Sequence, residues 1–273
     1  MAFALLRKGK RVAVWNRSPD KAGALVSAGA FLCDSAQSAL EASPATILVL
    51  LDNDAVTAVL DTVRADVLKN RTIINYTTDS KDESQALHCF INDRGGSYVK
   101  GAIVSYPRNI GNPDSYSIQA GDEEGFVRHR DLLEAIAGHA LFLPLDEAYA
   151  FSIALHTYAF AAMVAFYEAV GASGHLGMGT TETARLIFQA TRFFVSDALE
   201  DAVRRLETND IAGDQARLDV HLSAFEYLAE AMRARGASIP VFESIRDVTR
   251  KAQSLGYGDH DISSIIKVFA SGA

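Results

Sequence analysis

The chain has 273 residues, of which 49% are hydrophobic and 22% are charged, a composition typical of folded globular proteins and unlike that of disordered chains. Its length predicts two domains of ordinary size. The formal net charge of −8 at pH 7 argues against nucleic acid or an anionic membrane as partner, because both require clustered Lys and Arg. The cysteines, Cys33 and Cys89, are too few for a disulfide framework or a zinc site, so we expect a reducing cytoplasm and no metal.

Two stretches resemble targeting or membrane segments. The N-terminus is too short in apolar residues, and has the wrong order of charges, for a secretory signal. Residues 150–167 carry no charge, and their length is close to the roughly 18 residues at which a membrane helix becomes a candidate. They contain Ser152, His156 and Thr157 and are rich in alanine rather than leucine. We therefore predict a helix buried between subunits.

The first half of the chain alternates short apolar strands with helices, starting with a strand at residues 11–16 and a helix at 19–28 that Ser18 caps and Pro19 begins. This alternation predicts a parallel, doubly wound sheet. After Pro107 we expect one antiparallel strand. The later elements of this half are predicted as strands at 46–51, 72–76, 98–104, 116–120 and 140–143, and as helices at 55–67, 80–93 and 123–137.

The second half shows only helical periodicity. Helices are predicted at 148–170, 181–206, 216–235, 242–254 and 262–269. We therefore place the boundary near Asp146, between a Rossmann-type domain at residues 1–146 and a helical domain at 147–273.

The start of the chain departs from the usual Rossmann order. Residues 2–7 read as the last turns of a helix, whereas the fold needs a strand and a glycine-rich turn before that helix, whose amides approach a pyrophosphate. We expect about fifteen residues of strand and loop to be missing, by the usual length of a strand plus turn.

A phosphate-binding group follows the strand at residues 11–16. Asn16, Arg17 and Ser18 occupy the position that reads the adenosine ribose, and Lys21 lies one turn into the next helix. A carboxylate there would accept hydrogen bonds from a 2′-hydroxyl, whereas an arginine with polar neighbours suits a 2′-phosphate. This pattern favours NADP over NAD. The alternative is that Arg17 and Lys21 are ordinary solvated residues at a helix start.

Further cofactor contacts are expected where parallel strands end. Leu50, Leu51 and Asp52 lie at the end of one predicted strand, and Thr77 follows the next. Ligands bind at the carboxyl ends of strands in open parallel sheets, so these residues are candidates for the nicotinamide side. Equally, they can be polar residues that cap strand ends and the following helices.

Several segments together resemble the imine reductase and reductive aminase family, which lies within the beta-hydroxyacid dehydrogenase superfamily. They are residues 12–22, 51–56, 74–78, 100–107 and 255–266. The resemblance implies a 6-phosphogluconate dehydrogenase-like Rossmann domain, a long interdomain helix and a helical domain that swaps with a partner to form a homodimer. It also implies NADPH and a small-molecule C=N substrate, bound at the subunit interface.

The resemblance also assigns residues to this expected site. Val104 and Pro107 would border the reactive face of the cofactor, and Asp219 and His221 would be presented across the dimer to the substrate pocket. Relatives usually carry an Asp or Tyr on the long helix with an aromatic residue about two turns later. If Tyr158 is that aromatic residue, Ala150 takes the place of the proton donor.

Three side chains on the long helix remain candidates for catalysis: Tyr149, His156 and Tyr158. Tyr149 and His156 are seven residues apart and share a face, whereas Tyr158 lies on another side. Each can instead be a packing residue. A protonated iminium already carries its activating charge, so an imine substrate requires orientation more than a strong acid.

Two other functions stay open. Beta-hydroxyacid dehydrogenases use a lysine on the long helix for carbonyl chemistry, but this chain has no lysine between Lys100 and Lys251. The second alternative is a catalytically silent dimeric relative that has kept the fold.

Overall fold

The computed structural model describes residues 1–270, which form two compact units. Unit 1 comprises Met1–His156, and unit 2 begins at Thr157. The division falls within the long helix α8 (Leu145–Ser173), so this helix contributes residues to both units. The predicted boundary near Asp146 lies at the first turn of α8.

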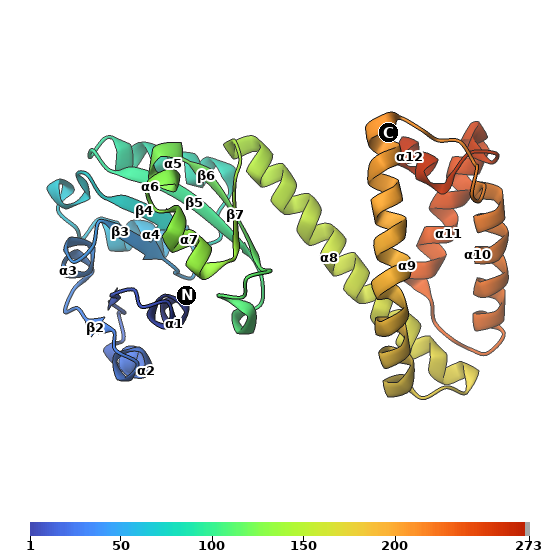
Figure 1. The fold of residues 1–273 in the computed structure, drawn as a ribbon, viewed down its shortest axis with the longest axis horizontal. Helices are drawn as coiled ribbons and strands as arrows, with labels where there is room; N and C mark the ends of the chain where they lie inside the picture. The colour runs from blue at the N-terminus through green and yellow to red at the C-terminus, as the bar shows by residue number, and fades with distance from the viewer. Residues whose placement is uncertain (271–273) are drawn as a thin grey trace. The chain divides into compact units, whose positions relative to one another are not determined.

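The centre of unit 1 is a five-stranded sheet in the order β3-β4-β5-β6-β7 (Figure 1). All neighbours are parallel except β5 and β6, which are antiparallel. The predicted parallel sheet with an antiparallel strand near residue 116 is confirmed. The strands are β3 (Ala45–Leu48), β4 (Thr72–Asn75), β5 (Ser97–Val104), β6 (Tyr116–Gly121) and β7 (His139–Phe142).

A second, two-stranded parallel sheet is formed by β1 (Ala13–Val14) and β2 (Phe31–Leu32). The predicted strand at residues 11–16 is thus shorter than expected, and β2 is too short to show a periodicity in the sequence. The chain opens with the expected helix, α1 (Ala2–Arg7). Among the described residues, no strand joins this two-stranded sheet to the five-stranded one.

The helices of unit 1 begin and end at local hydrogen bonds. Asp52 accepts from the backbone N–H of Ala55 at 2.9 Å and so starts α4 two residues before the predicted position. Ser80 and Glu83 form a capping box at the start of α5. The elements are α2 (Gly23–Ser27), α3 (Ala36–Glu41), α4 (Asn53–Leu60), α5 (Lys81–Asn92), α6 (Glu123–Arg128) and α7 (Arg130–Ile136), with 3-10 turns at Pro19–Ala22, Ala65–Leu68 and Pro107–Asn109.

Three predicted helices differ in the structure, and one helix was missed. The helix at 19–28 starts as a 3-10 turn, and Ser18, although at the N-cap, makes no side-chain cap bond; its N–H donates to the Asn16 side chain instead. The helix at 55–67 ends at Leu60. The helix at 123–137 is broken at His129, whose φ of −117° and ψ of 19° are not helical. α3 was not predicted.

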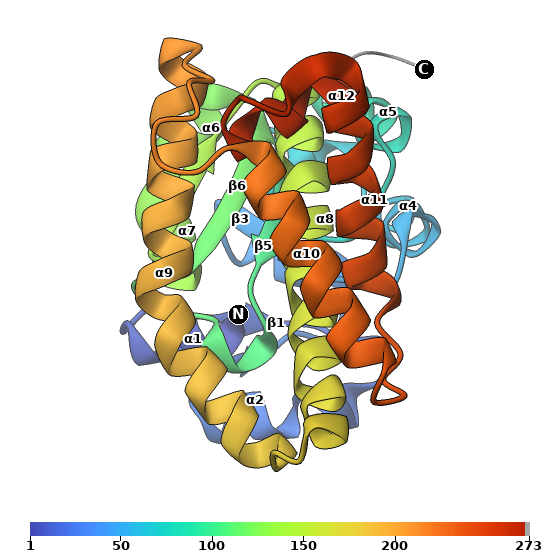
Figure 2. The same cartoon turned by 90° about the vertical axis from the view of Figure 1, so that its right-hand side faces the viewer.

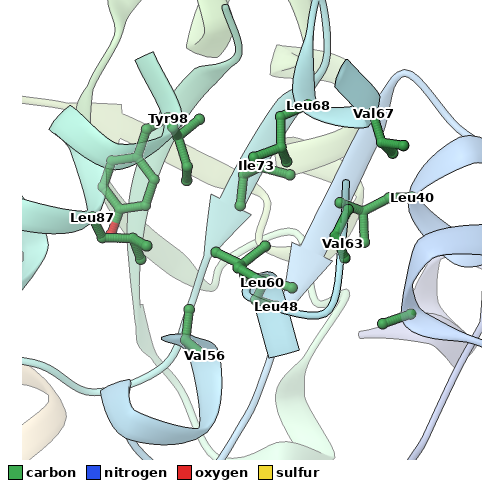
Figure 3. Close-up of a cluster of buried hydrophobic side chains, with 12 residues drawn as sticks. Leu40, Leu48, Val56, Leu60, Val63, Val67, Leu68, Ile73, Leu87 and Tyr98 are labelled. Carbon is green, nitrogen blue, oxygen red and sulfur yellow. The ribbon is translucent and has the colours of Figure 1, made fainter. Parts of the chain in front are cut away.

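The largest buried cluster lies between the sheet and the helices of unit 1 (Figure 3). Ile73 of β4 and Val56 of α4 are fully buried, and Leu87 of α5 lies beside Tyr98 of β5. These contacts fix α4 and α5 against the strands whose carboxyl ends carry the predicted site.

Unit 2 is helical throughout the residues described, as predicted (Figure 2). The helices α10 and α11 are joined through Phe225 and Phe242, whose rings meet edge to face at 5.6 Å. The Glu168 carboxylate of α8 accepts the N–H groups of Val241 and Phe242, each at 2.8 Å, which caps the first turn of α11. The helices are α9 (Thr180–Thr208), α10 (Leu218–Arg233), α11 (Pro240–Ala252) and α12 (Ile266–Ala270), with short turns at Gly174–Leu176, Gln253–Tyr257 and Ile262–Ile265.

A buried arginine holds the end of α9 to the following loop. The Arg205 side chain is 2% exposed and donates to Asp201 at 2.7 Å, to Asp214 at 2.5 Å and to the Ala212 carbonyl at 2.9 Å. These hydrogen bonds raise the pKa of Arg205, and the same guanidinium lowers the pKa of Asp201 and of Asp214. The carboxylates satisfy the donors of a charged group that would otherwise be costly to bury.

One helix in the described chain, Leu145–Leu176, is long and apolar enough by length and composition to cross a membrane. It begins with Asp146 and Glu147, and Glu168 near its end is bonded to α11. The segment was predicted to be a helix buried between subunits; its helical state is confirmed.

The close contact between Gly101 and Tyr76 gives a stability test. A Cβ on Gly101 would lie 2.4 Å from the Tyr76 ring, and that ring is held by a hydrogen bond from Gln119. We expect Gly101→Ala to lower the free energy of unfolding by about 1–3 kcal/mol, measured by urea denaturation. Gly23→Ala, in a helix with nothing within 4 Å of the new Cβ, is the matched control and should be neutral or slightly stabilising. Equal stability of the two variants would contradict the packing described.

Candidate active site

The candidate site is built on three parallel strands in register. Leu48 of β3 lies beside Asn75 of β4, and Asn75 lies beside Lys100 of β5. The carboxyl ends of β3 and β4 therefore lie level with Lys100, the fourth residue of β5. We call this end of the sheet, where ligands bind in open parallel sheets, the sheet edge.

Thr77 connects the ends of β3 and β4. Its hydroxyl accepts the Leu50 N–H at 3.0 Å, and its own N–H donates to the Asn75 side chain at 3.0 Å. The first bond explains why β3 ends at Leu48 rather than at the predicted residue 51, because the Leu50 amide bonds to a side chain and not to a strand. Sequence reasoning placed Leu50 and Thr77 at neighbouring strand ends, and the structure brings them into contact.

Of the two neighbouring candidates, Asp52 has a hydrogen-bonded side chain and Leu51 has an exposed one. The Asp52 side chain caps α4, so its alternative role as a helix cap is the one that the structure shows. Leu51, by contrast, is 89% exposed. An apolar side chain exposed at this edge is available to pack against a flat ligand ring.

The residues predicted to contact a phosphate after β1 are all exposed: Asn16, Arg17, Ser18 and Lys21. Within the described chain, neither Arg17 nor Lys21 takes part in an ion pair. The basic groups are therefore accessible to an anion in solution, as the predicted phosphate contact requires.

A buried ionic group lies at the same sheet edge. The Lys100 ammonium and the Asp79 carboxylate are 2.7 Å apart, with side chains 11% and 0% exposed. Lys100 also donates to the Thr77 carbonyl. The Tyr149 hydroxyl, from the first turns of α8, donates to the same Asp79 oxygen at 2.7 Å and to the Ser80 carbonyl at 2.9 Å. Three segments therefore converge on one carboxylate.

Burial sets the protonation behaviour of this group. It lowers the pKa of Lys100 below its usual value, although the Asp79 carboxylate opposes the shift. It also raises the pKa of Tyr149, with a further contribution from Asp79. The second oxygen of Asp79 is buried without a hydrogen-bond partner in the described chain. The tyrosine is therefore neutral, and the lysine gives up its proton more readily than a solvated lysine.

A second polar network lies behind this group. The Tyr98 hydroxyl contacts Asn75 at 3.3 Å and Ser84 at 3.2 Å, and burial raises the pKa of Tyr98 to about 12. This network contains no buried ion pair and joins β4, β5 and α5.

The candidates on α8 have different environments. Tyr149 is bonded to Asp79, whereas His156 contacts the Ser152 carbonyl of its own helix at 2.7 Å through Nδ1. Ala150 is exposed. Tyr158 is 51% exposed and belongs to unit 2. The structure thus brings Tyr149 together with the polar groups at the sheet edge.

The two residues expected along the cofactor's reactive face lie at the end of β5 and shortly after it. Val104 is the last residue of β5 and packs on the cluster that contains Ala148 of α8. Pro107 is exposed and begins a 3-10 turn. Both belong to unit 1, as does the buried ionic group.

The substrate-pocket candidates of unit 2 have local contacts. Asp219 accepts a hydrogen bond from the Gln253 side chain at 2.7 Å. Its carboxylate also lies close to Gly258, because a Cβ added to that glycine would be 2.6 Å from Asp219 Oδ1. This carboxylate therefore anchors the turn after α11. The ring of His221 lies 6.1 Å from that of Phe225.

Sequence reasoning missed Asp79 and Lys100. A signal was present, because Lys100 is a charged residue within an otherwise apolar strand, where lysine is rarely buried unless paired. Its partner could not be identified from the sequence, since Asp79 is 21 positions away and lies in a loop.

Family models match both halves of the chain. Residues 1–144 match the NAD binding domain of 6-phosphogluconate dehydrogenase, and residues 146–271 match the C-terminal domain of NADPH-dependent reductive aminase-like proteins. The chain belongs to the reductive aminase and imine reductase family. The predicted membership, Rossmann-type fold with a helical second half, and dinucleotide cofactor are confirmed.

Solved structures agree with this family. A Pseudomonas putida KT2440 protein provisionally described as an oxidoreductase is 56% identical, with a TM-score of 0.96 over 98% of this chain and 92% of that one. An imine reductase from Pseudomonas sp. is 28% identical with a TM-score of 0.88, covering 98% and 94%. A reductive aminase from Aspergillus terreus, in complex with NADPH and ethyl levulinate, is 28% identical with a TM-score of 0.86 and the same coverage.

Curated relatives include two kinds of reductase. An NADPH-dependent reductive aminase from Aspergillus oryzae is 25% identical over 100% of this chain and 93% of its own length. A glyoxylate/succinic semialdehyde reductase from Arabidopsis thaliana is 24% identical over 98% and 93%. This member of the family is thus a nicotinamide-dependent oxidoreductase.

Exposed residues of unit 1 fit such a cofactor. Exposed Arg17 and Lys21 suit a phosphate group, and the exposed side chains of Val49 and Leu51 suit a ring.

Proposed function

We propose that this protein is an NADPH-dependent reductase that converts the C=N bond of an imine or iminium into an amine. The observation that carries the proposal is the character of α8. From Ala148 to Tyr167 it bears no charged side chain, and Tyr149, whose hydroxyl bonds to Asp79, is neutral. An uncharged wall suits a substrate that brings its own positive charge.

The residues divide the work along the sheet edge. NADPH, when bound, supplies the hydride. Arg17 and Lys21, with Asn16 and Ser18, hold its 2′-phosphate, because cationic donors bind phosphate oxygens strongly. Thr77, Leu50, Leu51 and Asp52 border the cofactor further along this edge, and Val104 lies towards the reactive face.

The substrate is bordered by the start of α8 and by Pro107. Ala150 leaves space beside Tyr149 and donates no proton. His156 and Tyr158 are further candidates on α8, and Asp219 and His221 come from the helical unit of a second copy.

A carbonyl substrate is the second candidate, and the Arabidopsis thaliana relative supports it. Against it stands the lack of a lysine on α8, the group that the superfamily uses for alcohol and carbonyl interconversion. A catalytically silent relative would bind no cofactor or turn over neither substrate class.

The substrate class is tested by direct assay. We expect the full chain to oxidise NADPH in the presence of a cyclic imine such as 2-methyl-1-pyrroline, followed by the loss of NADPH absorbance. Glyoxylate and succinic semialdehyde are the carbonyl controls and should give a kcat/KM at least about tenfold lower, which corresponds to roughly 1.4 kcal/mol of barrier. Turnover of the aldehydes alone would favour the second candidate. No turnover across the panel, with no binding in an NADPH titration, would favour the silent relative.

The choice of NADPH over NADH is tested at the phosphate end. We expect Arg17→Ala to weaken NADPH binding about tenfold and to leave NADH binding unchanged, because only NADPH has the 2′-phosphate that the guanidinium meets. Binding is measured by NADPH fluorescence. Lys69→Ala removes an exposed positive charge just before β4, at the opposite edge, and should leave both affinities unchanged. An equal loss for NADPH and NADH in Arg17→Ala would contradict the assignment.

A homodimer is part of the proposal. The helices of unit 2 expose large apolar side chains, among them Phe188 (63%), Phe193 (78%) and Phe194 (73%) on α9 and Tyr227 (72%) on α10. Monomeric proteins rarely expose so many large apolar groups together. A second copy would cover them and the apolar length of α8. The free thiols Cys33 and Cys89 fit a reducing cytoplasm.

The dimer is tested by one charged substitution. Phe193→Asp places a carboxylate in the proposed interface and should shift the protein from dimer to monomer in analytical ultracentrifugation at micromolar concentration. Asp197→Asn, one turn further on the same helix, is the control and should stay dimeric. A wild-type chain that sediments as a monomer would contradict the proposal.

A further inference from the structure

The buried ionic group at the sheet edge has a chemical continuity that the proposed function does not use. Lys100 and Tyr149 bond to the same oxygen of Asp79, each at 2.7 Å. Hydrogen bonds thus run without a break from an ammonium on β5, through a carboxylate, to a phenolic hydroxyl on α8. The two ends differ in access: Tyr149 is half-buried, and the Lys100 side chain is 11% exposed.

We propose that Lys100, Asp79 and Tyr149 form a proton relay that ends at the substrate nitrogen. The relay rests on the proposed reduction of a C=N bond and names the proton donor that Ala150 cannot be. Tyr149 is the catalytic residue, because it alone meets the substrate. Asp79 and Lys100 act through it and are positioning residues that also carry the proton.

As the substrate carbon is reduced, the imine nitrogen forms an N–H bond and the O–H bond of Tyr149 breaks. The phenolic oxygen takes a proton from the Asp79 carboxyl, which receives one from the Lys100 ammonium. The amine has gained one proton and Lys100 has become a neutral amine. Solvent then returns the proton to Lys100 through its exposed edge.

The surroundings favour this transfer. Proton passage from Lys100 to Asp79 converts a buried ion pair into two neutral groups, which burial favours. The other ionisable groups near the relay are Glu83, whose charge acts on Lys100, and Tyr98, which lies near Tyr149. The Tyr98 hydroxyl is bonded to Asn75 and Ser84 rather than to Asp79. Asp79 is therefore the group that connects Lys100 to Tyr149.

A pair of substrates separates proton delivery from hydride transfer. 2-Methyl-1-pyrroline, assayed at a pH at which it is neutral, must gain a proton at nitrogen. Its N-methyl quaternary analogue, 1,2-dimethyl-1-pyrrolinium, carries a permanent charge and needs none. We expect Tyr149→Phe to lower kcat/KM for the neutral imine by about a hundredfold, the range of general acid catalysis, and to change that for the quaternary iminium less than about threefold.

Lys100→Arg separates charge from proton transfer. Arginine keeps the positive charge beside Asp79 but is not deprotonated in proteins. We expect this variant to show the same selective loss as Tyr149→Phe. Lys81→Met, which removes the exposed partner of Asp146, and Tyr98→Phe are the matched controls and should affect both substrates equally.

The remaining outcomes would overturn either the relay or the proposed function. Full activity of Lys100→Arg on the neutral imine, or equal losses on both substrates in Tyr149→Phe, would mean that the group is structural and that no relay operates. A wild-type enzyme that reduces neither substrate would instead refute the proposed function. The two failures are therefore distinguishable.

A second readout needs neither cofactor nor turnover. In ¹⁵N NMR of the lysine side chains, the Lys100 signal is identified by its loss in Lys100→Arg. We expect it to titrate below the other lysines, and Asp79→Asn to lower its pKa further by removing the opposing carboxylate. A Lys100 that titrates like the others and does not respond to Asp79→Asn would overturn the relay.

Discussion

The buried Asp79 carboxylate is the interaction on which the geometry of the sheet edge depends. It is bonded to Lys100 on β5, the central strand of the sheet, and to Tyr149 at the start of the long helix. A charge in such a place is costly unless it is paired. The carboxylate therefore restrains the loop after β4, the side chain on β5 and the first turns of α8 together, because a shift of any one of them leaves a buried charge without its partner.

The parallel register of the strands makes this meeting possible. Asn75 and Lys100 are paired across β4 and β5, so the loop that carries Asp79 leaves β4 level with the Lys100 ammonium. The loop itself is held at Thr77, which bonds to Leu50 and Asn75. The same hydrogen bonds thus position Thr77 and Leu50, which are expected to contact the cofactor, and the loop that carries Asp79. A shift of this loop would therefore affect both the expected cofactor contacts and the Lys100–Asp79 pair.

Much of the fold could be predicted from the sequence, and the failures have physical causes. The consecutive apolar residues Ile73–Ile74 of β4 and Ala102–Val104 of β5 are typical of buried parallel strands. β2 has two residues, too few for a period. The break at His129 depends on packing that no local pattern records. The phosphate contact predicted for Arg17 rests on the place of this residue after a strand, and the structure leaves its side chain exposed.

The candidate site was less predictable, since its decisive contacts are long-range. Tyr149 was chosen from its position on the long helix, yet nothing local indicated that its hydroxyl meets Asp79, 70 positions earlier in the chain. α8 carries no lysine, whereas Lys100 on β5 contacts the same carboxylate as Tyr149. In the proposed relay the lysine is thus supplied by the sheet, and the helix stays uncharged from Ala148 to Tyr167. An uncharged α8 in turn leaves the positive charge of an iminium unopposed by cations on that helix, whereas Lys100 is neutralised locally by Asp79.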